Sequence, residues 1–365
     1  CITRGGWGGL TAAIHLPRQA IDVGLMEKYA YSRHKVSRDY VSNEVLPYLS
    51  SLGVDVFQHG AKRIKRLNLT HQNGKSLHQN LPLGGFGISR YAFDKILADK
   101  AIEDKVKIIH DEVLDINFSK NSFYIMAKDR QLQAEFVISA HGKRSHLDKS
   151  LERKFIKEKT PWIGIKAHYN TKTFDETLVE LHNFQGGYCG LSKVENDQVN
   201  LCYLVHQKAF KKFKSIEKFN QNGLTQNPHL KHFLSQSEPT FEKPLSISQI
   251  SFQNKPTVKN HILFAGDSAG LIHPLCGNGM AMAIHSAKLV SEALVKFFKN
   301  AGQTRLSVEE DYQRQWQIHF KKRLFFGKVI QEILLKPDLS SKLISMLSGS
   351  PFLLKQLIKQ THGKP

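Results

Sequence analysis

Residues 261–287 read HILFAGDSAGLIHPLCGNGMAMAIHSA and form the most informative part of the sequence. The first residues are apolar and strand-like, and glycine-rich turns follow before a long helical pattern with small residues on one face. A strand here delivers Asp267 at its carboxyl end, which is where open α/β sheets bind their ligands. A simple surface turn would not explain why Gly277-Asn278-Gly279 opens the helix. The segment therefore predicts a ligand site.

The amino-terminal stretch carries a second glycine-rich turn. Residues 1–16, CITRGGWGGLTAAIHL, predict a strand, a glycine turn and a helix, and residues 21–28 predict the next buried strand. Gly6 and Gly9 fit the second and third positions of a G-x-G-x-x-G turn, which lets backbone approach a pyrophosphate at a helix N-terminus. Glu27 closes the second strand, where an acidic side chain commonly accepts hydrogen bonds from an adenosine ribose.

Length and composition limit the class of protein. With 365 residues the chain exceeds the size at which one core stops growing, so we expect two domains and a smaller appendage. A hydrophobic content of 41% suffices for packed cores and excludes a disordered tail. Four scattered cysteines without a C-x-x-C pair predict neither a metal site nor a disulfide framework, and favour a cytoplasmic setting. No apolar run of about 18 residues predicts a membrane-spanning helix.

The net charge of +20 arises from 52 Lys and Arg against 32 Asp and Glu. Such a charge suits a lysine-rich solvated surface, an anionic membrane, an acidic carrier protein that holds the substrate, or nucleic acid. The basic residues are spread along the whole chain without interleaved aromatics, so we expect no nucleic acid partner. The basic helical tail from Ser307 allows peripheral docking on a membrane, although packing of its apolar faces on the rest of the chain is favoured.

The middle of the chain alternates strand-like and helical patterns. Short helices are predicted over residues 41–52 and 91–104. Residues 113–140 switch to period two and predict three short strands, VLDINF, SFYIMAK and LQAEFVISA, joined by polar turns. Strand-like runs over 160–251, with one Lys-rich helical insert at 208–219, predict a separate antiparallel sheet.

In this order the segments resemble the FAD-dependent oxidoreductases of the para-hydroxybenzoate hydroxylase type, and within them the geranylgeranyl reductase-like and flavin monooxygenase branch. The resemblance covers nearly the whole chain. It includes the glycine turn, SRYAFDKILADKA from Ser89, HGKRS at 141–145, GGYCGLSK at 186–193 and, most specifically, the segment from Gly266. It implies an α/β fold with a Rossmann-like FAD-binding domain and β-meander, an α+β second domain with an antiparallel substrate-binding sheet, and a helical C-terminus.

The same resemblance divides the chain into three parts. We expect a discontinuous FAD-binding domain over residues 1–58, 85–150 and 256–300, a substrate domain over 59–84 and 151–255, and C-terminal helices over 301–365.

The resemblance also implies a cofactor site. Glu27 would bind the adenosine ribose of FAD and Asp267 its ribityl chain, and Arg90 would lie near the cofactor. The predicted cofactor-binding residues are Gly6, Gly9, Glu27, Arg90, Gly266, Asp267, Gly277, Asn278, Gly279 and Met280. A helix that begins near Asn278 and points at the flavin would stabilise the negative charge that builds on reduction. No catalytic acid or base is identified, and the candidates near the flavin are His273, Pro274, Gly277 and Asn278.

Several residues depart from the family pattern. Arg4 replaces the first glycine of the turn, Ala20 stands where the family often has glycine, and Pro17 falls where the first helix should continue. Arg38 occupies a position that is usually glycine near the flavin, and Gly190 stands where the reductase branch tends to carry an aromatic residue. These departures bear on how tightly FAD binds and leave the fold assignment unchanged.

Three functions follow from these patterns. The favoured one is an FAD-dependent monooxygenase that uses NAD(P)H as a transient reductant and acts on a small hydrophobic or aromatic substrate. The alternative is saturation of an isoprenoid or polyene double bond, as in the geranylgeranyl reductases. The third is a degenerate flavoprotein fold that binds FAD weakly, motivated by the departures in the first forty residues.

Overall fold

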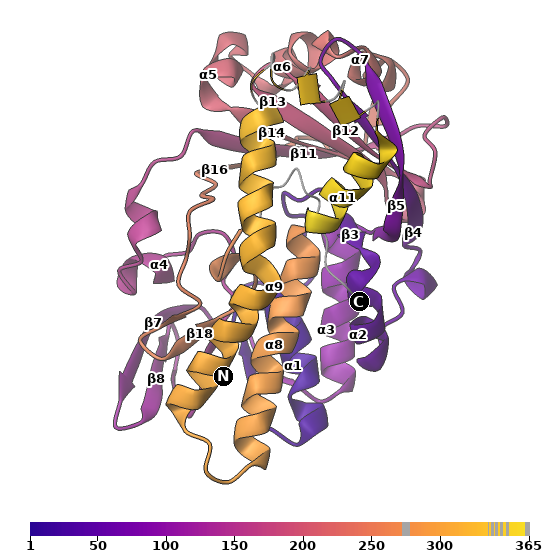
Figure 1. Ribbon diagram of the computed structural model, residues 1–365. Coiled ribbons are helices and arrows are strands. Elements are labelled where there is room, and N and C mark those ends of the chain that lie inside the picture. Colours follow the sequence, from indigo (N-terminus) through magenta and orange to yellow (C-terminus); the bar gives the residue numbers. More distant parts are fainter. Residues whose placement is uncertain are drawn as a thin grey trace.

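The computed structural model describes residues 1–271, 278–334, 336, 339, 342, 343, 346, 347 and 350–361. Its strands form a six-stranded, a nine-stranded and a three-stranded sheet. The nine-stranded sheet lies at the top of Figure 1, several helices run side by side beneath it, and one long helix near the C-terminus rises to the level of the sheet. No helix in the described part of the chain combines the length and apolarity that a bilayer crossing requires.

The six-stranded sheet is parallel except at one edge. Its strands, in spatial order, are β17 (Val258–Lys259), β18 (Ile262–Phe264), β10 (Ile138–Ser139), β1 (Ile2–Thr3), β2 (Gly24–Met26) and β6 (Lys107–Ile109). Among the described strands of this sheet, only β17 runs antiparallel to its neighbour. Ile2 lies opposite both Leu25 and Ile138, and all three are buried, so one apolar row crosses the centre of the sheet. The parallel direction brings the carboxyl ends of β1, β2 and β18 to one edge.

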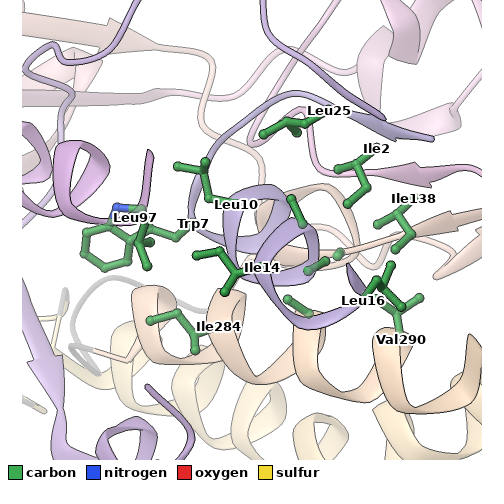
Figure 2. Packing of buried hydrophobic residues seen from close by; sticks show 14 of the residues in the cluster. Ile2, Trp7, Leu10, Ile14, Leu16, Leu25, Leu97, Ile138, Ile284 and Val290 are labelled. Atoms are coloured by element: carbon green, nitrogen blue, oxygen red, sulfur yellow. The ribbon is translucent and has the colours of Figure 1, made fainter. Parts of the chain in front are cut away.

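Two helices form the core beside this sheet, the first packing against the strands and the second against the first helix. They are α1 (Trp7–His15) and α8 (Gly279–Lys299), and Figure 2 shows Ile14 of α1 near Ile284 of α8 within the apolar core. A Cβ on Gly8 would lie 3.3 Å from the carbonyl oxygen of Ala283, so a glycine allows the close approach of the two helices. A third helix, α3 (Arg90–Glu103), is capped by Ser89, whose Oγ accepts from the N–H of Ala92.

The nine-stranded sheet is mostly antiparallel. Its spatial order is β15 (Glu238–Pro239), β11 (Trp162–Asn170), β14 (Val199–His206), β13 (Gly187–Lys193), β12 (Leu178–Phe184), β4 (Lys62–Thr70), β5 (Ser76–Gly87) and β3 (Tyr40–Ser42), with β16 (Leu245–Ser248) beside β11. One face packs against α5 (Gln207–Phe210), α6 (Ile216–Asn222) and α7 (Pro228–Ser235) through the cluster that includes Tyr203, Phe219 and Leu230. The other face carries Tyr188 and Leu204, which pack with Ile330 and Leu354 of the C-terminal helices.

The C-terminal helices join the two larger sheets. Helix α9 (Arg305–Leu334) contributes Tyr312 and Phe320 to the core around the parallel sheet, and Ile330 to the core under the antiparallel sheet. Helix α11 (Pro351–Thr361) lies against α9 and β5, as Figure 1 shows. The apolar faces of both helices are therefore turned toward the rest of the chain.

The observed fold class is the expected one, and the domain boundaries remain a prediction. The three-stranded meander consists of β7 (Val113–Ser119), β8 (Ser122–Ala127) and β9 (Gln131–Ala134). The prediction that LQAEFVISA is a single strand is wrong, because the chain breaks after Ala134 and its last part forms β10 in the parallel sheet. The helix predicted over 41–52 is shorter in the structure, where α2 covers Leu46–Ser51, and the helix predicted over 91–104 agrees with α3.

Candidate functional site

A cavity of about 400 Å³ lies between the parallel sheet and one face of the antiparallel sheet. Its lining includes the glycine turn and Glu27 at one end and Tyr188 and Leu204 at the other, with Asp267 among the residues that line it too. Glu27 and Asp267 follow β2 and β18, which are far apart in the sequence and separated by two strands in the sheet. One cavity thus reaches both predicted carboxylates.

The glycine turn forms the nucleotide end of the cavity. Gly6 is the N-cap of α1, and Gly6, Trp7 and Gly8 line the cavity where the first N–H groups of the helix lie. A Cβ on Gly9 would overlap the carbonyl oxygen of Arg4, so only glycine fits one turn into the helix. Arg4 itself has φ +76°, the left-handed region that a glycine would adopt without strain.

Glu27 is buried directly beneath this turn. Its Oε2 accepts from the N–H of Gly5 at 2.8 Å and its Oε1 accepts from the N–H of Tyr29 at 3.1 Å. The Arg4 guanidinium lies 3.7 Å from Oε1. The backbone bonds fix the carboxylate at the end of β2, where it faces the cavity.

Arg90 begins α3 and lines the same end of the cavity. Its guanidinium lies 4.6 Å from the ring centre of Trp7 and 3.0 Å from Asp94. Asp94 also accepts from Lys35 at 2.7 Å. Burial, together with the nearby Arg90 charge, lowers the pKa of Lys35. The shared carboxylate therefore holds two cations at the rim of the cavity.

Asp267 follows β18 in the short 3₁₀ turn Gly266–Ser268. Gly266 has φ +65°, and its N–H donates to Ser286 Oγ of α8 at 2.7 Å. Lys255 donates to the carbonyl oxygens of Asp267 at 2.8 Å and of Lys143 at 3.0 Å, and burial lowers its pKa to about 8. These contacts tie the turn to α8 and to the HGKRS segment.

A second buried hydrogen-bond network contacts the turn that contains Asp267. His141 lies between Ser139 Oγ at 2.8 Å and Asp148 at 2.9 Å, and Arg153 donates to Asp148 at 3.1 Å and to the carbonyl oxygen of Ser268 at 2.7 Å. Burial lowers the pKa of His141, which therefore stays neutral near pH 7. We assign this network a positioning role.

The start of α8 contributes further residues that were predicted to bind the cofactor. Gly279 and Met280 line the cavity, and Asn278 is buried as the N-cap of the helix. Of the remaining predicted residues, Gly9 packs behind the turn, and His273, Pro274 and Gly277 lie outside the described residues.

The apolar end of the cavity is built on the antiparallel sheet. Tyr188 of β13 pairs with Leu204 of β14, which pairs with Gly164 of β11, so the three residues share one face. Ile247 and Ile250 extend this lining. The GGYCGLSK segment thus contributes one wall.

Arg38 enters this end from the loop before β3. A Cβ on Gly190 would lie 2.8 Å from Arg38 Cδ, so the arginine side chain occupies the space that a side chain at position 190 would fill. The two departures from the family pattern, Arg38 and Gly190, are therefore in contact, and the small residue makes room for the large one.

A buried ion cluster that the sequence did not predict holds this loop. Asp39 accepts from Lys166 at 2.5 Å and His168 at 3.1 Å, both on β11, and from Ser37 at 2.7 Å. Burial alone would raise the pKa of Asp39, but the positive charge of Lys166 and the His168 contact hold it below its ordinary value. No sequence pattern links residues 127 positions apart.

The groups at the cavity match the chemistry of FAD. The N-terminus of α1 and the nearby guanidinium groups of Arg33 and Arg144 suit phosphates, and the carboxylates of Glu27 and Asp267 suit sugar hydroxyls.

Two further observations agree with a ligand at this end. A Cβ on Gly6 would find only the Ala140 carbonyl oxygen, at 3.8 Å, so the space above the turn is open. The indole Nε1 of Trp7 is buried and has no hydrogen-bond partner among the described residues.

Known proteins with related sequences include a halogenase and several reductases. Tryptophan 2-halogenase of Chondromyces crocatus is 25% identical over 349 residues, which are 87% of this chain, and the chain spans only 65% of that protein's length. The digeranylgeranylglycerophospholipid reductase of Methanococcus aeolicus is 22% identical over 347 residues, covering 90% of this chain and 85% of the reductase.

Solved structures share the fold. The myxobacterial chondrochloren halogenase CndH superposes with a TM-score of 0.79 at 16% identity, covering 100% of this chain and 93% of its own. PqsL, a probable FAD-dependent monooxygenase from Pseudomonas aeruginosa, gives a TM-score of 0.75 at 15% identity, covering 94% and 98%. The family model described as "FAD binding domain" matches residues 1–317, so the chain belongs to this family of FAD-dependent oxidoreductases, as the sequence resemblance implied.

Proposed function

We propose that this chain is an FAD-dependent monooxygenase that takes reducing equivalents from NADH or NADPH and acts on a small, largely apolar substrate. The observation that carries the proposal is the single cavity. It runs from the glycine turn and Glu27 to Tyr188 and Leu204, so a nucleotide site and an apolar chamber open into each other.

Bound FAD supplies the redox chemistry, because it accepts hydride from a nicotinamide and reacts with dioxygen once reduced. The chain's own residues bind and orient. Glu27 and Asp267 accept hydrogen bonds from sugar hydroxyls, and the N-termini of α1 and α8 place partial positive charge at the cavity. Tyr188 and Leu204 exclude water from the end where the substrate binds.

Reduction of a carbon–carbon double bond is the second candidate. Three of the curated relatives are digeranylgeranylglycerophospholipid reductases, and one of them matches 90% of this chain. Halogenation by a related flavin reaction has the same kind of support, from the tryptophan 2-halogenase.

Product analysis distinguishes these reactions. The full chain is loaded with FAD and reduced with NADH or NADPH. It is then mixed with a panel of phenols, indoles, aromatic and aliphatic acids and isoprenoid alcohols under labelled dioxygen, with and without bromide. We expect a product that carries one labelled oxygen atom. A product that gains only hydrogen, or that requires bromide, would replace monooxygenation with the corresponding candidate.

Before the product analysis, the visible spectrum of the purified chain tests whether it binds FAD. A chain that develops no bound-flavin absorption after FAD addition would overturn all three reactions and would support the degenerate fold instead. A chain that binds FAD and forms none of these products would contradict the proposed reaction alone.

A further inference from the structure

Arg38 places a guanidinium group among the substrate-facing residues of the antiparallel sheet. On the cavity side of this sheet, Gly190 of β13 lies opposite Cys202 of β14, and Cys202 lies opposite Lys166 of β11. The Arg38 side chain lies over Gly190, with Nη1 3.7 Å from the position of a Cβ there. Its neighbours toward the apolar end are Tyr188 and Leu204, which continue the same face.

The backbone around Arg38 is held firmly. Its carbonyl oxygen accepts from Ser192 Oγ at 3.1 Å, and the carbonyl oxygen of Ser37 accepts from Asn200 Nδ2 at 3.4 Å. The next residue, Asp39, is buried in its pair with Lys166. The side chain of Arg38 therefore extends from an anchored loop, which lowers the entropy cost of using it to bind a ligand.

The Arg38 guanidinium lacks an acidic partner within the part of the chain that the structure describes. Among the described residues no carboxylate forms an ion pair with it, and its Nη2 is buried without a hydrogen-bond partner. The neighbouring cations each have an acidic partner. Lys35 and Arg90 share Asp94, and Lys166 pairs with Asp39. A cation left in this state carries a desolvation cost that a bound anion removes.

We propose that Arg38 binds the carboxylate of the substrate, so that the substrate class is an amphipathic acid with an aromatic or aliphatic body. The body packs against Tyr188 and Leu204, and the planar guanidinium donates to both carboxylate oxygens. Gly190 is part of this site because it leaves room for the arginine. The inference rests on the proposed function, since it names the substrate of that reaction.

Binding measurements test this assignment without turnover. The FAD-loaded full chain is titrated with benzoate, phenylacetate and octanoate, and with benzamide, phenylacetamide and octanamide, by calorimetry and by the flavin absorption spectrum. We expect at least one acid to bind about tenfold or more tightly than its amide, the effect of one charge-assisted hydrogen-bonded pair. Arg38→Gln should remove that preference and leave amide binding unchanged.

Two other variants complete the test. Gly190→Ala should lower the acid preference, because its Cβ would lie 2.8 Å from Arg38 Cδ and displace the side chain. Arg63→Gln is the matched control, since Arg63 is exposed and stacks on Phe57 at 3.7 Å.

The proposal is overturned if no acid binds more tightly than its amide, or if Arg38→Gln weakens both equally. A shift of the flavin midpoint potential in Arg38→Gln with an unchanged acid preference would assign Arg38 to the cofactor instead. Acid binding without any oxygenated product would contradict the proposed reaction and leave this site intact.

Discussion

Arg4 adopts a backbone conformation that costs a non-glycine residue about 1–2 kcal/mol. Replacing it with glycine should therefore raise the free energy of unfolding by about 1 kcal/mol, measured by urea denaturation. The same change should tighten FAD binding, because it removes the guanidinium 3.7 Å from Glu27 Oε1.

Lys105→Gly is the control for this change. Lys105 also has positive φ, at +58°, and lies outside the cavity, so its replacement should stabilise the fold and leave FAD affinity unchanged. Weaker FAD binding by Arg4→Gly would show instead that the Arg4 side chain contacts the cofactor.

Gly9 occupies a position in the turn where a larger residue would not fit. Its missing side chain accommodates the carbonyl oxygen of Arg4, so Gly9→Ala should destabilise the protein by about 1–3 kcal/mol and weaken FAD retention. Gly24→Ala is the comparison, since a Cβ there makes only an ordinary contact at 3.8 Å. Equal thermal unfolding temperatures for both variants would refute the steric explanation.

Sequence patterns find residues whose role depends on local geometry. Gly9 and Glu27 follow from strand–turn–helix logic, and Asp267 from its place after a strand, and all three lie at or beside the cavity. Pro17 falls where the first helix was expected to continue, but α1 ends at His15 and the proline starts a separate 3₁₀ turn.

Contacts between distant segments were not predictable in this way. The pairing of Asp39 with Lys166, and the packing of Arg38 over Gly190, depend on how the loop before β3 folds against the antiparallel sheet. The strand pair β4 and β5 was also missed, although the Asn73-Gly74 dipeptide between the strands is a turn signal that could have revealed it.

The buried cluster connects the loop before β3 to β11 and should control acid stability. The pKa of Asp39 is lower in the folded chain than its ordinary value of 3.8. The ionised pair therefore contributes stability that is present above about pH 4 and is lost as the pH falls through the lower, folded pKa. Asp39→Asn should flatten this acid limb in urea denaturation measured from pH 7 downward.

Paired substitutions separate the charge from the packing. Lys166→Met alone leaves Asp39 buried without its main partner and should cost about 3–5 kcal/mol. The double variant with Asp39→Asn should recover much of that loss, because neither charge then remains unpaired. Additive losses would mean that the pair contributes no interaction energy.

At the scale of the whole molecule, α9 contacts both large sheets and connects them. Tyr312 donates to the carbonyl oxygen of Phe264 at the end of β18, and Ile330 packs with Tyr188 on the antiparallel sheet. The inner face of the helix therefore packs on the rest of the chain, which was the favoured expectation. The outer face still exposes Ile318 and Phe325, by 65% and 63%.

This outer face suits an anionic membrane, which remains a proposal. The exposed Lys321, Lys322 and Lys328 lie on the helix beside Ile318 and Phe325, so apolar insertion and attraction to lipid phosphate would act together. We expect the full chain to float with vesicles that contain phosphatidylserine and to remain behind with phosphatidylcholine alone. Added salt should weaken flotation, since the charges are exposed.

A variant pair distinguishes this face from the general effect of a +20 chain. Ile318→Ser with Phe325→Ser removes the apolar groups and keeps every charge, so it should reduce flotation. Tyr124→Ser with Met126→Ser removes two comparably placed side chains, 45% and 46% exposed, from the meander and should not. Equal flotation of both double variants would show that charge alone attracts the protein and that α9 does not enter the lipid surface.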